Sequence, residues 1–98
     1  MSTRYEDLFR SLRNRGEGAF VPFLMLGDPT PEHTLAIVRT VVAAGADALE
    51  LGVPFSDPVA DGPTIQASHL RTLDGGATVD SALEQVRAIR AEFPELPI

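Results

Sequence analysis

The chain lacks cysteine and lysine, and each absence excludes a class of site. Without cysteine, the 98 residues can form no disulfide and no thiolate metal site. All eight basic residues are Arg, so the chain holds neither a Schiff-base lysine nor the lysine of a phosphate-binding P-loop. A formal charge of -6 disfavours nucleic acid or an anionic membrane as a partner. The longest apolar runs, 19–26 and 36–46, are interrupted and too short to span a membrane.

The remaining composition is that of a soluble globular protein. The chain is 44% hydrophobic and 22% charged, and its length allows one small domain. The first twelve residues are amphipathic and contain acidic side chains, unlike a signal peptide with its charged start and apolar core. We therefore expect a cytoplasmic protein.

Helices are expected wherever apolar residues recur at helical spacing next to a capping residue or a glycine. The predicted helices begin after Thr3, after Thr30, near Thr64 and after Thr78, and they end before 14–18, Gly45, Gly75 and Pro94. The residues expected to face the core are Tyr5, Leu8, Phe9 and Leu12 in the first helix, Leu35, Val38, Val41 and Val42 in the second, Ile65, Leu70 and Leu73 in the third, and Leu83, Val86 and Ile89 in the fourth. The two histidines, His33 and His69, are expected on exposed helix faces, with no pairing that would make them metal ligands.

Strands are expected between these helices. Residues 19–26 are apolar at odd and even positions, which predicts a strand buried on both faces, although Pro22 removes one ladder hydrogen bond. Residues 46–51 form a second predicted strand, in which Glu50 shares a face with the alanines two and four positions before it. Residues 96–98 resemble the start of a third strand.

This alternation of strands and helices is typical of a parallel α/β sheet. Two complete strands cannot close a stable sheet, and a (β/α)₈ barrel needs about 250 residues. We therefore expect residues 1–98 to be the N-terminal portion of a single TIM-barrel domain, truncated after a leading helix and roughly the first two β/α units.

Glu50 is a lone carboxylate in an otherwise apolar predicted strand. If that strand is buried, desolvation disfavours the charged carboxylate and suits Glu50 to acid/base catalysis. Glu50 also lies at the C-terminal end of the strand, where α/β barrels place their active sites. The alternative is a buried carboxylate whose partners are backbone groups or an Arg, and the residues alone leave both interpretations open.

A loop with two carboxylates follows, from 52 to 63. Asp57 and Asp61 can be simple turn residues, because Asp side chains bond nearby backbone groups. The functional interpretation is that one Asp faces Glu50 across a substrate, so that two carboxylates take separate roles.

A longer pattern resembles a known family. Residues 44–58 (AGADALELGVPFSDP) and 60–66 (ADGPTIQ) resemble the signature of tryptophan synthase α subunits, as do 18–23 (GAFVPF) and 27–29 (GDP). The match runs along essentially the whole chain, in order and without visible gaps. The resemblance implies a (β/α)₈ barrel that cleaves indole-3-glycerol phosphate into indole and glyceraldehyde 3-phosphate.

The resemblance also implies roles for individual residues. Glu50 is expected to transfer the proton at indole C3 and to relay protons to and from the glycerol hydroxyl. Asp61 is expected to accept a hydrogen bond from the indole N–H and to stabilise the positive charge that develops there. Phe23 and Ile65 are expected to line the indole pocket. The positions that the resemblance places against a β subunit are Pro54, Asp57 and Pro58. The assembly implied is an α2β2 heterotetramer.

No cofactor and no metal are expected in this chain, since pyridoxal phosphate belongs to the β partner. Phosphate binding is expected outside these residues, because barrels place it after strands seven and eight. Two other hypotheses remain: an inactive folding or assembly fragment that self-associates, and another phosphate-binding barrel with borrowed chemistry.

Overall fold

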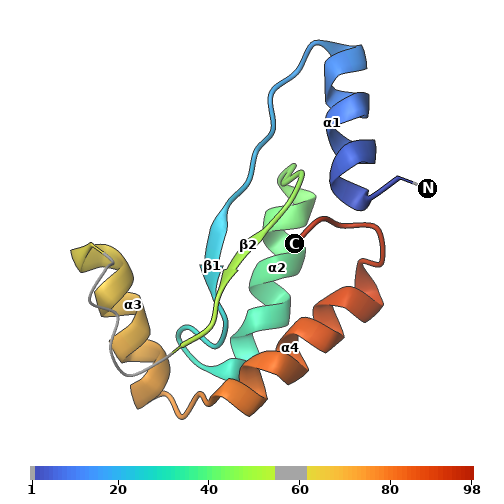
Figure 1. The fold of residues 1–98 in the computed structure, drawn as a ribbon. Coiled ribbons are helices and arrows are strands. Elements are labelled where there is room, and N and C mark those ends of the chain that lie inside the picture. The colour runs from blue at the N-terminus through green and yellow to red at the C-terminus, as the bar shows by residue number, and fades with distance from the viewer. Residues whose placement is uncertain (1, 55–61) are drawn as a thin grey trace.

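Helices alternate with the two strands of a parallel sheet in the computed structural model, which describes residues 2–54 and 62–98 (Figure 1). The elements are, in chain order, α1 (Arg4–Arg15), β1 (Phe23–Met25), the 3-10 helix η1 (Pro31–His33), α2 (Thr34–Ala43), β2 (Glu50–Gly52), α3 (Pro63–Asp74) and α4 (Val79–Glu92). None of the described helices is long and apolar enough to cross a membrane. The predicted order of helices and the first two strands is confirmed.

Helix α1 begins where its sequence predicts. The Thr3 hydroxyl accepts a hydrogen bond from the Glu6 N–H at 3.1 Å, and the Glu6 carboxylate accepts one from the Thr3 N–H at 3.3 Å, which completes a capping box. Gly16 ends the helix in the left-handed conformation, with φ of 67°. The predicted apolar stripe is fully buried only at Leu12, because α1 stands away from the sheet and its two aromatic rings are exposed (Figure 1).

The two strands pair in parallel and are shorter than predicted. The register pairs Phe23 with Glu50, Leu24 with Leu51, and Met25 with Gly52. Strand β1 starts only after Pro22, which has no N–H to donate, although the Pro22 carbonyl accepts the Glu50 N–H at 3.0 Å. Residues 96–98 are not a strand. They contribute one backbone hydrogen bond beside β2, from the Leu49 N–H to the Pro97 carbonyl at 2.9 Å.

The hydrophobic core lies on one face of the sheet, where α2 and α4 pack together (Figure 1). Its buried residues are Leu26, Val38, Leu49, Ala82 and Ile89. Leu24 of β1 and Leu51 of β2 pack against this cluster. Because side chains alternate along a strand, the residues on either side of these leucines project from the opposite face. The sheet therefore has one helix-covered face and a second face that bears Phe23 and Glu50.

Helix α3 buries a polar face instead of the predicted apolar one. Its buried residues are Ser68, His69 and Thr72. Leu70, expected in the core, is 59% exposed. The helix turns this way because Asp28, just after β1, accepts a hydrogen bond from the Ser68 hydroxyl at 2.6 Å. The prediction that His69 lies at the surface is wrong, since only 3% of it is exposed, whereas His33 is exposed as predicted.

The hydroxyl of Thr34 joins the loop after β1 to α2, and α2 to α4. The Thr34 hydroxyl accepts the Gly27 N–H at 2.9 Å and donates to the Gln85 side-chain oxygen. Thr30, predicted to cap the second helix, makes no side-chain cap bond, because its hydroxyl is bonded to the ring Nδ1 of His33 at 2.7 Å. A 3-10 turn therefore precedes α2.

Candidate active site

Phe23 and Glu50 occupy the same register position on the two strands. Register partners in a parallel pair project from the same face, and this face is the one opposite α2 and α4. The aromatic ring that the resemblance assigns to the pocket and the carboxylate that it assigns to catalysis are thus neighbours. The arrangement suits a substrate that combines a flat apolar ring with an atom to be protonated.

The Glu50 side chain is exposed, although the sequence predicted a poorly solvated position. That prediction rested on a long buried strand over 46–51. In the structure β2 begins only at Glu50, and the core helices cover the other face of the sheet. The expected burial of this carboxylate is therefore wrong for the chain as described.

Phe23 forms an apolar surface next to Glu50. It is 37% exposed, while Met25, two residues along the same face, is only 6% exposed. The end of the Phe23 ring reaches along β2 to Gly52, the register partner of Met25. One face of the sheet therefore presents a carboxylate and an aromatic ring, with a buried thioether behind them.

The other predicted site residues follow β2 in the sequence. Asp57, Pro58 and Asp61 lie outside the described residues, so their predicted roles stay predictions. Pro54, a predicted partner contact, is fully buried. Ile65, a predicted pocket residue, is half-buried in the first turn of α3, which packs against β1.

Asp28, which follows β1, forms an ion pair with Arg71 at this same end of the sheet. Its carboxylate accepts two hydrogen bonds from Arg71, at 3.0 and 2.8 Å, besides the bond from Ser68. The hydrogen bonds from Arg71 hold the pKa of Asp28 below its usual value, with help from Ser68 and against a smaller effect of burial. The pair fixes the β1–α2 loop to α3, the helix that follows Asp61 in the sequence. The sequence holds no local signal for it, because 43 residues separate the partners.

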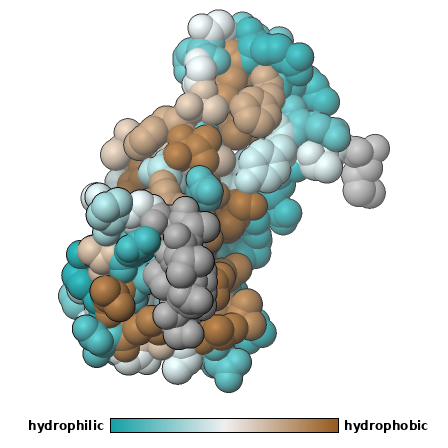
Figure 2. All heavy atoms as spheres, turned by 60° about the vertical axis from the view of Figure 1, so that its left-hand side comes forward, coloured by the Kyte–Doolittle hydropathy of each residue, from teal (hydrophilic) through white to brown (hydrophobic). Residues whose placement is uncertain are grey.

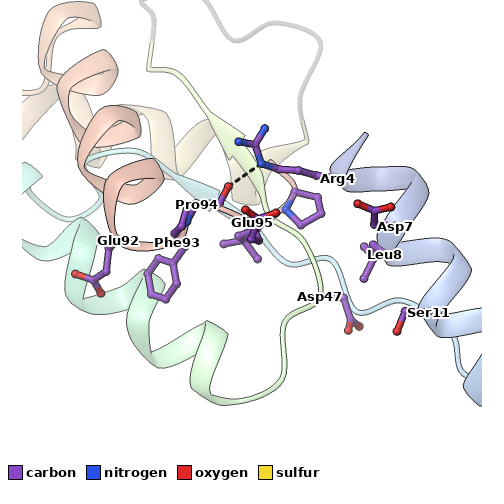
Figure 3. A pocket seen from close by; sticks show the side chains of 11 residues that line it. Arg4, Asp7, Leu8, Ser11, Asp47, Glu92, Phe93, Pro94 and Glu95 are labelled. Carbon is purple, nitrogen blue, oxygen red and sulfur yellow. Dashed lines mark hydrogen bonds between the residues drawn. The ribbon is translucent and has the colours of Figure 1, made fainter. Parts of the chain in front are cut away.

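A cavity of about 540 Å³ lies between α1 and the segment after α4 (Figure 3). Two of the polar side chains that line this cavity form hydrogen bonds with backbone groups of the chain itself. Arg4 Nε donates to the Pro94 carbonyl at 2.7 Å, and the Asp47 carboxylate accepts the Phe20 N–H at 2.7 Å. Asp47 and Phe20 both precede their strands, so the cavity lies at the N-terminal end of the sheet. Active sites of α/β barrels lie at the opposite end.

Apolar side chains are exposed on the surface, and Figure 2 shows some of them over the middle of one face. Those on or beside the two strands are Phe20, Val21, Phe23 and Val53. Among residues 2–54 and 62–98, no three His, Cys, Asp or Glu side chains are grouped so that they could hold a metal ion.

Comparisons with known proteins agree on one family. The sequence profile described as "Tryptophan synthase alpha chain" matches residues 9–98. A tryptophan synthase alpha chain from Corynebacterium diphtheriae is 78% identical over 96 residues, covering 98% of this chain and 34% of the relative. This chain therefore spans about a third of the length of the curated relatives that it matches.

Solved structures give the same result. Tryptophan synthase subunit alpha from Legionella pneumophila superposes with a TM-score of 0.91 at 37% identity, over 99% of this chain and 37% of the other. A tryptophan synthase complex from Pyrococcus furiosus matches with a TM-score of 0.70 at 43% identity, over 76% of this chain and 31% of the other. The likeness confirms the predicted fold class, since these neighbours contain the TIM barrel whose N-terminal part this chain represents.

Proposed function

The chain belongs to the tryptophan synthase alpha chain family, and we propose that it forms part of an enzyme that cleaves indole-3-glycerol phosphate. The products are indole and glyceraldehyde 3-phosphate. The observation that supports this proposal is the shared register of Phe23 and Glu50 on the sheet face opposite the core helices. An aromatic substrate that must be protonated on its ring needs such a pair of neighbours.

Glu50 is the proposed acid and base of this carbon–carbon cleavage. As a carboxylic acid it donates a proton to indole C3, so that the bond from C3 to the glycerol carbon can break. As a carboxylate it then accepts the proton of the glycerol hydroxyl, whose carbon becomes the aldehyde. The electron pair of the broken bond returns to the indole ring, which leaves as neutral indole.

Asp61 is the proposed stabiliser of the charged intermediate. Protonation at C3 places positive charge on the indole nitrogen, and an ionised carboxylate that accepts its N–H lowers the free energy of that state. The two carboxyl groups need opposite conditions, because Glu50 must become neutral in each cycle whereas Asp61 must stay ionised. Glu50 is exposed in the residues described, so its desolvation in the enzyme requires that bound substrate or other parts of the enzyme cover this face of the sheet.

The proposed partner is the β subunit, in an α2β2 assembly. The match to the Pyrococcus furiosus tryptophan synthase complex supports a partner, and Pro54, Asp57 and Pro58 are its proposed contacts. No cofactor is proposed for this chain, because acid/base groups are sufficient for the cleavage, and pyridoxal phosphate is assigned to the β subunit. The cytoplasm is the proposed compartment.

An alternative is that residues 1–98 alone form an inactive, self-associating fragment of this subunit. The exposure of Phe23 and of the neighbouring apolar residues of the strands favours it. An open edge of a short sheet also offers unpaired backbone groups to a second copy. This alternative concerns the isolated chain and does not conflict with the enzyme proposal.

The experiment is a two-product assay on the full-length α chain that contains these residues, with and without the β partner. Indole is measured by its absorbance, and glyceraldehyde 3-phosphate is measured by a coupled dehydrogenase. Equimolar formation of both products is the expected result. If neither product forms from indole-3-glycerol phosphate in either arrangement, the proposed activity is wrong.

A further inference from the structure

Gly52 stands at the end of β2, on the face that bears Phe23 and Glu50. Its register partner is Met25, and Phe23 is the register partner of Glu50. All four positions share this face, since side chains alternate along each strand. Because glycine has no side chain, neighbouring side chains can occupy the space that a side chain of residue 52 would take on this face.

Two side chains from β1 fill that space. A Cβ atom on Gly52 would lie 2.6 Å from Cζ of the Phe23 ring and 3.0 Å from both Cε and Sδ of Met25. Real Cβ atoms essentially never show contacts under 3.0 Å. The backbone of Gly52 is not in the left-handed region, so its conformation does not require glycine. Gly27 differs, because its φ of 97° alone favours glycine.

We propose that Gly52 is a positioning residue for the indole pocket, because the absence of its side chain sets where the Phe23 ring lies beside Glu50. The ring starts at the level of Glu50 and ends against Gly52, about 7 Å further along the strand. The inference rests on the proposed function, in which this ring supports the indole while Glu50 protonates it.

A methyl group on Gly52 would move the ring and leave the fold intact. Reaching an ordinary contact of 3.4 Å from 2.6 Å requires a shift of about 0.8 Å at the ring end. Phe23 is 37% exposed and can yield, whereas Met25 is 6% exposed and is held more firmly. A displaced ring contacts the indole less well in the bound substrate and in the transition state alike, and a loss of such uniform binding raises KM.

The test compares Gly52→Ala with Gly18→Ala in the full-length α chain assembled with β. Gly18 is the matched control, because a Cβ there meets nothing within 4 Å and its φ is not in the left-handed region. Gly52→Ala is expected to raise KM for indole-3-glycerol phosphate about 10-fold, with a smaller effect on kcat, because the ring contacts the indole before and during the reaction. Gly18→Ala is expected to leave both unchanged.

Repeating the substitution in a Phe23→Leu variant separates an effect of the ring position from a general loss of structure at the site. Phe23→Leu removes the ring atoms that reach Gly52, so adding Gly52→Ala to it should change KM by less than about 2-fold. The same 10-fold loss in both backgrounds would overturn the proposal, as would an unchanged KM in the single variant.

A crystal structure of Gly52→Ala provides a readout that does not depend on activity. If the parent enzyme releases no indole, the proposed function is wrong, and the ring position alone decides the inference. A Phe23 ring displaced by about 0.8 Å or more supports the positioning role. A ring in its original place overturns it.

Discussion

Replacing Asp28 by Asn should weaken the fold at the end of the sheet nearest the candidate site. The carboxylate binds Arg71 through two hydrogen bonds and Ser68 through one, and it thereby joins the β1–α2 loop to α3. Asparagine keeps one oxygen acceptor, loses the charge and turns an NH2 group towards a cation.

The expected loss follows from the exposure of the pair. A hydrogen bond to a charged group contributes about 1.5–3 kcal/mol when it is well shielded. The Arg71 side chain is 58% exposed and that of Asp28 is 19% exposed, so solvent screens the pair to about 1 kcal/mol. Weakening the Ser68 bond adds up to about 1 kcal/mol. We therefore expect Asp28→Asn to lower the free energy of unfolding by about 1–2 kcal/mol at neutral pH.

The loss should depend on pH in one direction. The hydrogen bonds from Arg71 lower the pKa of Asp28 in the folded state from its usual value of 3.8. The contribution to stability is therefore complete above pH 3.8 and disappears as the pH falls through the lower folded pKa. Wild type and Asp28→Asn should converge in stability in that acid range.

Urea unfolding of the full-length α chain, at neutral pH and in steps into the acid range, measures both effects. Arg71→Gln should reproduce most of the loss, and Arg87→Gln, at an exposed position on α4, should change little. Equal stability of Asp28→Asn and wild type at neutral pH would refute the reasoning. So would a difference that stays constant into acid, because the charge of Asp28 would then not be its source.

Three further predictions concern the core, the second carboxylate and the isolated chain. Ile89→Ala removes a fully buried core side chain and should cost about 2–5 kcal/mol in urea unfolding, so a loss below about 1 kcal/mol would contradict the assigned core. Asp61→Asn should lower kcat for indole release far more than it weakens substrate binding, and a change in KM alone would indicate a positioning role. Residues 1–98 alone should self-associate and release no indole; a monomer by sedimentation, with protected amides in hydrogen exchange, would contradict the first part.

The helix ends could be predicted from sequence because their causes are local. Thr3 with Glu6 and Thr78 with Ser81 each form a capping box within four residues. Gly16 stops α1 through its own backbone conformation. Neither feature depends on how distant parts of the chain pack.

Strand lengths and helix faces depend on distant partners and were predicted less well. The first strand begins only after Pro22, because proline has no N–H to donate to the ladder. The buried face of α3 follows from the hydrogen bonds that Asp28 accepts from Ser68 and Arg71. These partners are too far from Asp28 in the sequence for a local pattern to predict them. Hydrophobic spacing alone therefore placed Leu70 inside the fold, although it is exposed.

The sequence predicts which residues form the candidate site, but it does not predict how exposed they are. The adjacency of Phe23 and Glu50 follows from two parallel strands in a particular register, and the family resemblance had assigned both residues to one site. The exposure of Glu50 depends on what covers the second face of the sheet. The alternation of side chains along a strand predicts which residues share a face, but not what covers that face. The positioning role of Gly52 required the atomic positions of its neighbours.

The central claim is that Glu50 moves the protons of the cleavage, and one measurement tests it most directly. Glu50→Gln in the full-length α chain is compared with Glu84→Gln, an exposed position on α4, for indole release and for substrate binding at equilibrium. Loss of a positioned acid and base should lower kcat about 10²–10⁴-fold in Glu50→Gln while the dissociation constant of indole-3-glycerol phosphate stays nearly unchanged. Turnover by Glu50→Gln at the rate of Glu84→Gln would contradict the account.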